Sequence, residues 1–319
     1  MKTALLFPGQ GSQYVGMGRS LWEASPDVRK LYQAAASLLG FDVERICFEG
    51  PKERLNTTLY TQPILFILSV AVFRTFEKEV DLPTAFVAGH SLGEYAALTA
   101  SGSLGFEDGL LLVRKRAAYM HESVPQGTGG MAAVMGLAAE EVESICRESA
   151  GGRTLVPANY NAPSQIVISG EEEPLERAEA LARQRRAKTV RLPVSAPFHS
   201  PMMMQASRML EHAIRDVAFR DPRWPWISNV TASPVERGDE CKRLLPLQVR
   251  SPVLWEASIR RMMELGVTRF IELGPQKVLQ GLCRRIDPGI LCQSAETPQE
   301  LKALAGTVEK AEEKTGAHA

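Results

Sequence analysis

The stretch that decides the fold is Phe86-Val87-Ala88-Gly89-His90-Ser91-Leu92-Gly93-Glu94, in which a short apolar run leads into a Gly-x-Ser-x-Gly pentapeptide. The residues that follow, 94–98, favour a helix. A serine with glycines two positions before and two positions after it is typical of a nucleophile elbow, a tight turn between a strand and a helix. We therefore expect Ser91 to present its hydroxyl at the end of a strand, with the N–H of Leu92 poised for a developing oxyanion.

The composition is that of a globular protein, because 319 residues with 45% apolar side chains can build a sizeable core. The 37 basic and 37 acidic residues balance, so the total charge gives no reason to expect nucleic acid or a membrane as a partner. No apolar run approaches a membrane span, and the run from Ala4 to Phe7 is too short for a signal peptide. We therefore expect a cytoplasmic protein.

The five cysteines are scattered and form no Cys-x-x-Cys pair. Their odd number and wide spacing argue against a disulfide framework and against a zinc site, and they fit a reducing compartment. We expect buried or incidental thiols and no bound metal. The five are Cys47, Cys146, Cys241, Cys283 and Cys292.

A second strand-to-turn pattern lies near the N-terminus, where the apolar run from Ala4 to Phe7 is stopped by Pro8-Gly9-Gln10-Gly11-Ser12. The pattern predicts a buried first strand that opens into a glycine-rich turn and then a helix. The turn lacks the Gly-Lys-Ser/Thr of a Walker loop. From this loop alone, a tight strand-to-helix connection is favoured over a binding role.

Two predicted helices belong to the same half of the chain. Residues 63–76 are apolar nearly all round, which predicts a buried helix. Residues 106–124 form an amphipathic helix, and Arg116 falls inside its apolar stripe. A buried guanidinium without a partner is costly, so an internal salt bridge and a ligand contact are both open for Arg116. The stripe consists of Leu110, Val113, Ala117 and Met120.

The pattern of apolar residues changes at residues 128–194, where it predicts the element order β-α-β-β-α-β, a split βαβ unit. We expect this segment to be a compact subdomain inserted into a larger α/β core, which is formed by residues 1–127 and 195–292. The predicted strands are 131–137, 154–159, 165–169 and 189–194, and the predicted helices are 138–149 and 174–187.

A basic cluster near the end of this insert has no acidic residue within it. A solvated helix end is the favoured interpretation, because cations near a helix C-terminus interact well with its dipole. A docking patch for an acidic partner is the alternative. The cluster consists of Arg183, Arg185, Arg186, Lys188 and Arg191.

His199 stands between two prolines, Pro197 and Pro201, in a predicted loop where the insert returns to the core. A histidine in such a place has few roles in a hydrophobic core, so His199 is the candidate general base. His90 is expected to point to the other side of the turn from Ser91. The remaining histidines are expected at the surface, and they are His121, His212 and His318.

The last part of the chain predicts a strand at residues 269–273, ended by Gly274-Pro275, and a helix at residues 278–286. Beyond Ala295 the sequence is rich in Glu, Lys and Ala and has no clear apolar face. We therefore expect residues 293–319 to be a mobile or weakly docked C-terminal tail.

The constellation of Ser91, His199, Arg116 and the glycine-rich first loop resembles the malonyl-CoA:acyl carrier protein transacylases, including the free-standing acyltransferases of polyketide synthesis. The resemblance covers roughly residues 3–292. The matching stretches are Phe7-Pro8-Gly9-Gln10-Gly11-Ser12-Gln13, Gln62-Pro63, Gly89-His90-Ser91-Leu92-Gly93-Glu94-Tyr95, Gly130-Met131-Ala132-Ala133-Val134, Asn159-Tyr160-Asn161, Phe198-His199-Ser200, Ser251-Pro252-Val253 and Glu272-Leu273-Gly274-Pro275.

This resemblance implies an α/β-hydrolase-like core with a ferredoxin-like insert, and it implies roles for single residues. Ser91 would be the acylated nucleophile and His199 the base. The backbone N–H groups of Gln10 and Leu92 would form the oxyanion hole, and the backbone carbonyl of Gln248 would orient the histidine in place of an acid.

The resemblance also implies how the substrate is held. Arg116 would bind the free carboxylate of a malonyl group, which a guanidinium can pair bidentately. Gln10, Asn161 and Phe198 would contact the substrate as well, and Phe198 fits the malonyl-selecting pattern. Two positions depart from the family pattern. Ala117 stands where the family usually has glycine, and Pro197 stands where it often has alanine.

The implied reaction moves a malonyl group from malonyl-CoA to the phosphopantetheine thiol of an acyl carrier protein, through an acyl-serine intermediate and without a cofactor. We expect the carrier protein as the partner, a monomer, and a place in fatty acid or polyketide biosynthesis. An acyl-thioester hydrolase is the alternative. It would share Ser91 and His199 but would have no need of Arg116.

Overall fold

Two β-sheets organise the chain. The computed structural model describes residues 1–125, 127–194 and 196–306, and within them one sheet has the strand order β10-β9-β1-β2-β7-β8 and the other β4-β5-β3-β6. The strands are β1 (Lys2–Phe7), β2 (Thr84–Gly89), β3 (Gly129–Met135), β4 (Leu155–Ala162), β5 (Gln165–Glu171), β6 (Lys188–Arg191), β7 (Trp226–Ile227), β8 (Pro234–Val235), β9 (Val267–Leu273) and β10 (Leu291–Ala295). The helices are α1 (Arg19–Ala24), α2 (Pro26–Leu39), α3 (Val43–Phe48), α4 (Lys52–Leu55), α5 (Thr58–Glu79), α6 (Gly93–Ala100), α7 (Phe106–Glu122), α8 (Ala139–Ala150), α9 (Glu172–Gln184), the 3₁₀ turn η1 (Pro201–Met203), α10 (Met204–Ile214), α11 (Gly238–Gln248), α12 (Trp255–Glu264) and α13 (Val278–Ile286).

The larger sheet is parallel except for β8, which pairs antiparallel with β7. β1 lies between β2 and β9, and its alternate residues enter two different cores. Leu5 and Phe7 pack on one face, and Ala4 and Leu6 pack on the other. A strand buried on both faces reads as a continuous apolar run, so the predicted buried first strand is confirmed.

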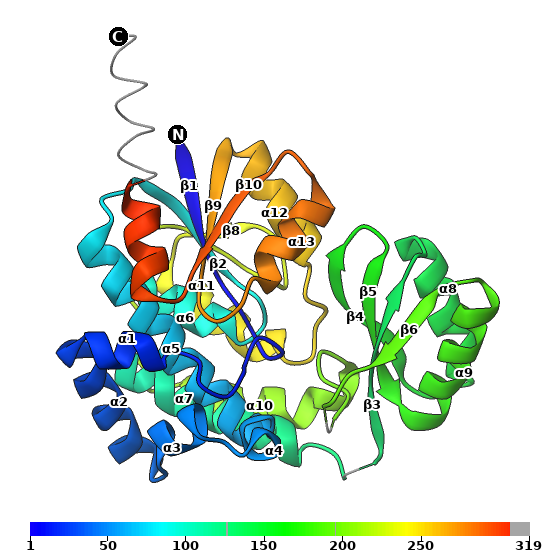
Figure 1. Cartoon of the computed structure of the whole chain (residues 1–319). Coiled ribbons are helices and arrows are strands. Elements are labelled where there is room, and N and C mark those ends of the chain that lie inside the picture. The colour runs from blue at the N-terminus through cyan, green and yellow to red at the C-terminus, as the bar shows by residue number, and fades with distance from the viewer. Residues whose placement is uncertain (126, 195, 307–319) are drawn as a thin grey trace.

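Helices cover both faces of this sheet (Figure 1). α5 and α7 pack in the core of one face, and α12 and α13 pack in the core of the other. α5 is long and apolar enough to cross a membrane, and 78% of its most apolar window is buried inside the protein. The expectation that no run approaches a membrane span is therefore wrong for α5, which is apolar on every side because it is packed on every side.

The insert folds as the predicted β-α-β-β-α-β unit, from β3 to β6, around a hydrophobic core of its own. Its four strands are antiparallel neighbours, and the sheet lies beside the parallel one in Figure 1. The predicted fold class, a parallel α/β core with an inserted antiparallel sheet, is thereby confirmed. The two parts are tied together where the Tyr160 N–H donates to the Val253 carbonyl at 2.9 Å and the Val253 N–H donates to the Ala158 carbonyl at 2.8 Å.

The C-terminal segment differs from its prediction. Residues 291–295 form β10, which pairs parallel with β9 at the edge of the larger sheet, so the core does not end at residue 292. Leu301 and Leu304 are buried in the core next to the sheet. The tail prediction is therefore wrong up to residue 306, because these two leucines lie three residues apart on one helical face. Residues 307–319, which include His318, lie outside the described residues.

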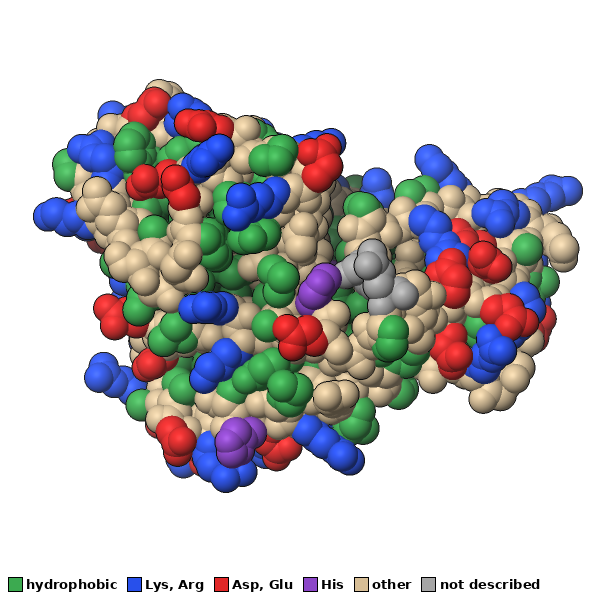
Figure 2. Space-filling view, turned by 90° about the horizontal axis from the view of Figure 1, so that it is seen from below, with side chains coloured by type: hydrophobic (Ala, Val, Ile, Leu, Met, Phe, Trp, Pro, Cys, Tyr) green, Lys and Arg blue, Asp and Glu red, His purple; other side chains and the backbone are tan. Residues whose placement is uncertain are grey.

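The basic cluster of the insert is partly neutralised by acids from other segments. Arg185 pairs with Glu148 of α8 at 2.8 Å, and Arg191 pairs with Glu179 of α9 at 2.6 Å. Figure 2 shows acidic and basic side chains mixed over the surface of the insert. This pairing favours a solvated surface over a docking patch for an acidic partner.

Candidate active site

Ser91 occupies the tight turn between β2 and α6, with a backbone φ of 51°. The turn is possible because both flanking glycines lack a side chain. A Cβ on Gly89 would lie 1.9 Å from the backbone of Gly93, and a Cβ on Gly93 would lie 2.0 Å from the Phe7 carbonyl oxygen. The predicted strand, turn and helix around Ser91 are therefore present, and the left-handed conformation at Ser91 is a strained one of the kind found at functional sites.

His199 lies against this serine, with its Nε2 2.8 Å from the Ser91 Oγ. Its Nδ1 lies 2.9 Å from the Gln248 carbonyl oxygen and 3.2 Å from the Ser251 carbonyl oxygen. A carbonyl only accepts hydrogen bonds, so Nδ1 carries the proton and Nε2 is free to accept one from the Ser91 hydroxyl. Burial, followed by the charge of Arg116, lowers the pKa of His199 to about 3, which keeps the imidazole neutral.

Arg116 reaches the same oxygen from α7. Its Nη2 donates to the Ser91 Oγ at 2.9 Å and to the Gln248 Oε1 at 2.8 Å, and its Nη1 donates to the Gln62 Oε1 at 2.7 Å. The side chain is 1% exposed. No carboxylate of the described residues forms an ion pair with it, and its Nε has no hydrogen-bond partner among them. Of the two alternatives left by the sequence, the internal salt bridge is therefore wrong, and a ligand contact remains.

A cavity of about 220 Å³ opens at these three side chains. The predicted oxyanion-hole residues Gln10 and Leu92 line it, as do the predicted substrate contacts Asn161 and Phe198. Its walls come from both parts of the fold, since Asn161 belongs to β4 of the insert and Phe198 to the returning core segment. The cavity therefore brings together the predicted site residues except Gln248, which contacts Arg116 and His199 without lining the cavity.

His90 makes its hydrogen bond away from Ser91, as expected from its side of the turn. Its Nε2 lies 2.8 Å from the Asn161 Oδ1, so this contact joins the core to the insert. The ring nevertheless lines the cavity, which the sequence did not predict. Burial lowers the pKa of His90, so it is neutral at physiological pH.

Three buried polar residues at the site were missed as site residues by the sequence analysis. Gln62 accepts from Arg116, and Asn229 accepts from the Ser91 N–H at 2.8 Å and donates to the Gly89 carbonyl at 2.8 Å. Glu94, one turn after the nucleophile, is 0% exposed and accepts from the Gln248 side chain at 2.6 Å. The one feature of the sequence that could have indicated them is a polar residue within an apolar segment, such as Gln62 near the start of the apolar helix α5.

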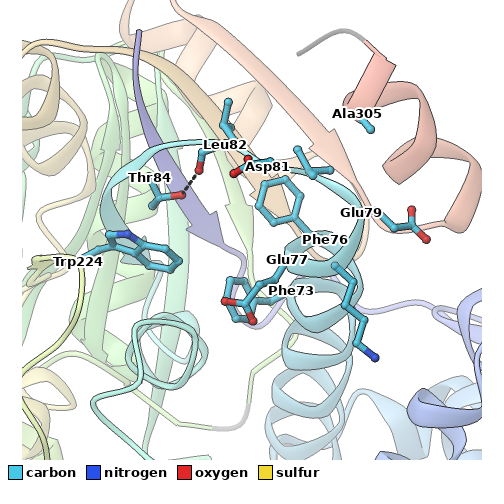
Figure 3. Close-up of a pocket in the computed structure, with 11 residues that line it drawn as sticks. Phe73, Phe76, Glu77, Glu79, Asp81, Leu82, Thr84, Trp224 and Ala305 are labelled. Atoms are coloured by element: carbon cyan, nitrogen blue, oxygen red, sulfur yellow. Dashed lines mark hydrogen bonds between the residues drawn. The ribbon is translucent and has the colours of Figure 1, made fainter. Parts of the chain in front are cut away.

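A second cavity of about 450 Å³ lies at the C-terminal end of α5 (Figure 3). It is lined by Phe73 and Trp224, which pack edge to face, and by Glu77, which pairs with Arg223. None of the predicted site residues lines it. A larger cavity of about 1100 Å³ beside α2 and α5 also contains none of them, so the cavity at Ser91 is the candidate active site. Among the described residues, no group of three or more His, Cys, Asp or Glu side chains could hold a metal ion.

Comparison with known proteins agrees with this geometry. Residues 4–311 match a family model described as an acyl transferase domain. The malonyl CoA-acyl carrier protein transacylase of Bacillus subtilis strain 168 is 40% identical over 311 residues, which cover 97% of this chain and 98% of that protein. The chain belongs to the malonyl-CoA:acyl carrier protein transacylase family.

Solved structures of this family have the same fold. The malonyl CoA-acyl carrier protein transacylase of Coxiella burnetii is 39% identical, with a TM-score of 0.93 over 96% of this chain and 97% of that chain. A malonyl-transacylase solved in complex with a type II PKS acyl-carrier protein is 36% identical, with a TM-score of 0.92 over 94% of this chain and 98% of that chain. The family assignment therefore holds for both the core and the insert.

Proposed function

We propose that the protein transfers a malonyl group from malonyl-CoA to the phosphopantetheine thiol of an acyl carrier protein. The relatives named above are described as malonyl CoA-acyl carrier protein transacylases, and one was solved with its carrier protein. The observation that carries the proposal for this chain is the buried guanidinium of Arg116, which lies 2.9 Å from the Ser91 hydroxyl and forms no ion pair with a carboxylate of the described residues. The free carboxylate of malonyl-CoA would supply a partner for this guanidinium.

The first half-reaction loads the serine. The Nε2 of His199 accepts the proton of the Ser91 hydroxyl, and the Oγ attacks the thioester carbonyl carbon of malonyl-CoA. The carbonyl oxygen becomes an oxyanion, which the backbone N–H groups of Leu92 and Gln10 stabilise. The carbon–sulfur bond then breaks, and the imidazolium gives the proton to the departing coenzyme A thiolate. The product is a malonyl ester on Ser91.

The second half-reaction reverses these steps with a different thiol. The phosphopantetheine thiol gives its proton to His199, and its sulfur attacks the ester carbonyl carbon. The ester bond to Ser91 breaks, and the proton returns to the Oγ. The Gln248 and Ser251 carbonyls hold the imidazole in the required tautomer throughout, which is the task of the acid in a Ser-His-Asp triad. The proposed cycle uses no cofactor and no metal.

Arg116 favours transfer over the alternative hydrolase. A hydrolase needs only the serine, the base and an oxyanion hole. A buried cation aimed at the nucleophile adds nothing to water attack, but it favours an acyl group that ends in a carboxylate. Phe198 lines the same cavity as Arg116, and we infer that its bulk favours a malonyl group over larger acyl groups.

We propose that the protein is cytoplasmic and monomeric. The described residues include all five cysteines, and each is free and buried, which supports a reducing compartment. Ser91, His199 and Arg116 all come from one chain and already meet there, so the site needs no second copy.

The proposal is tested by measuring the intact mass of the protein after exposure to malonyl-CoA, methylmalonyl-CoA and acetyl-CoA in separate samples. We expect one malonyl group per chain, and release of that group when a carrier protein with its phosphopantetheine arm is added. His199→Ala should slow the loading by roughly 10²- to 10⁴-fold, as for a lost general base. Release of free malonate at the same rate without the carrier protein would support the hydrolase instead.

A further inference from the structure

Glu94 has no role in the proposed chemistry, yet it is a buried carboxylate close to the nucleophile. It is 0% exposed. Its Oε1 accepts the Asn229 N–H at 2.6 Å, and its Oε2 accepts the Gln248 Nε2–H at 2.6 Å. Burial is the largest influence and raises the pKa of Glu94 to about 8, although these two hydrogen bonds and the charge of Arg116 lower it. Both oxygens nevertheless accept from N–H donors, which is the pattern of the ionised carboxylate, the form to which the role proposed below belongs.

The Gln248 side chain links this carboxylate to Arg116. Its Nε2 donates to Glu94 and, at 2.6 Å, to the Ser91 carbonyl, while its Oε1 accepts from the Arg116 Nη2 at 2.8 Å. The reversed amide would face its oxygen to the carboxylate and its N–H groups to the guanidinium. Both contacts would then be repulsive, so Glu94 and Arg116 together fix the orientation of Gln248.

Glu94 is also the counter-charge of Arg116. No carboxylate of the described residues pairs directly with the guanidinium. Burial lowers the pKa of Arg116, and the neighbouring Tyr95 and then Glu94 raise it. A direct ion pair would occupy the guanidinium and leave nothing for a substrate carboxylate. A carboxylate held one amide away compensates the charge but leaves the Nη2 aimed at Ser91.

We propose that Glu94 is a positioning residue for malonyl selection: acting through the Gln248 side chain, its carboxylate holds the Arg116 guanidinium against the Ser91 hydroxyl. This role rests on the proposed function, because it gives Arg116 the malonyl carboxylate as its ligand. Glu94 touches neither the substrate nor the reacting atoms. Its effect should therefore appear in the choice between acyl groups rather than in the reaction itself.

The test is Glu94→Gln, which keeps the shape and removes the charge. A glutamine there cannot accept from both the Asn229 N–H and the Gln248 side chain without facing one donor with another. Single-turnover loading is measured by intact mass with malonyl-CoA and with acetyl-CoA. We expect the malonyl-to-acetyl ratio of rate constants to fall roughly 10- to 100-fold, the size of a lost charge-assisted hydrogen bond.

Glu272→Gln is the matched control. Glu272 is also 0% exposed, and its oxygens accept the backbone N–H groups of Leu279 and Gln280 at 3.0 and 2.9 Å rather than a donor of the Gln248–Arg116 network. This variant should lose stability and keep the wild-type malonyl-to-acetyl ratio. A Glu94→Gln variant that keeps the ratio, or loses both activities in equal proportion, overturns the proposal. Absence of a malonyl adduct on the wild-type protein would instead refute the proposed function.

A stability measurement decides the matter if Glu94→Gln is too unstable to assay. Removing one charge of a buried pair is costly, whereas removing both costs much less. The double variant Glu94→Gln/Arg116→Gln should therefore have a higher midpoint of thermal unfolding than Glu94→Gln alone. A double variant as unstable as the sum of the two single variants would show that Glu94 is not the counter-charge of Arg116, and would overturn the proposal.

Discussion

The Nη2 of Arg116 lies 2.9 Å from the Oγ of Ser91, so the cation proposed to hold the substrate donates a hydrogen bond to the proposed nucleophile. The Nε2 of His199 lies 2.8 Å from the same oxygen. Without a substrate, the guanidinium therefore acts on both the serine and the base. If the proposed function holds, a malonyl carboxylate that pairs with Arg116 would neutralise this charge and so favour proton transfer to His199. Recognition of the carboxylate and activation of the serine would then be coupled through one oxygen atom.

Ser91→Ala should abolish the covalent malonyl adduct, because the hydroxyl held by His199 and Arg116 is gone. Intact mass after exposure to malonyl-CoA measures this directly. Ser12→Ala is a suitable control, since that buried hydroxyl donates to the Gly9 carbonyl and lines no part of the cavity. A malonyl adduct that persists on the Ser91→Ala protein would show that the nucleophile lies elsewhere.

The pH dependence of loading should reflect the lowered pKa of His199. Burial first, and the charge of Arg116 second, lower this pKa from 6.5 to about 3. A base is active when unprotonated, so a lowered pKa preserves activity as the pH falls and removes it only near the folded-state pKa. The second-order rate constant of loading, which reports the pKa of the free enzyme, should stay nearly constant from about pH 8 to about pH 5.

Arg116→Ala tests the cause of this shift, because it removes the second-largest contribution to it. The rate of that variant should begin to fall at a higher pH than the rate of the wild type. A wild-type rate that halves near pH 6.5 would contradict the lowered pKa of His199.

Gly93→Ala should prevent the elbow from forming. An added Cβ would lie 2.0 Å from the Phe7 carbonyl oxygen and 2.8 Å from its carbon, and both belong to the backbone of the central strand. We expect failure to fold or a large drop in the midpoint of thermal unfolding. Gly281→Ala in α13 is the control, because its Cβ would meet nothing within 4 Å. The control should gain about 0.5–1 kcal/mol of stability from the higher helix propensity of alanine.

The sequence predicted those features that depend on residues close together in the chain. These are the tight turn at Ser91 with its two glycines, the β-α-β-β-α-β order of the insert, and the apolar stripe of the helix that carries Arg116. The network around Arg116 could not be found in this way, since Gln248 meets Ser91 across 157 positions of the chain. Nothing in the sequence around Glu94 indicates that it faces Gln248 rather than solvent. A strand as short as β8, with two residues, also carries no periodicity.

Arg116→Ala separates malonyl transfer from the hydrolase alternative. If Arg116 holds the malonyl carboxylate, its loss removes a charge-assisted pair in a dry site, a cost of about 1.5–3 kcal/mol or more. Malonyl loading should fall by at least about tenfold, whereas acetyl groups, which have no carboxylate, should be accepted equally well or better. The preference between the two acyl groups should therefore reverse, as measured by intact mass in a mixture of malonyl-CoA and acetyl-CoA. Arg114→Ala is the control, because that exposed arginine on the same helix donates to the Leu38 carbonyl and lies outside the cavity. Equal losses for both acyl groups would make Arg116 a structural residue, and no change for either would favour the hydrolase.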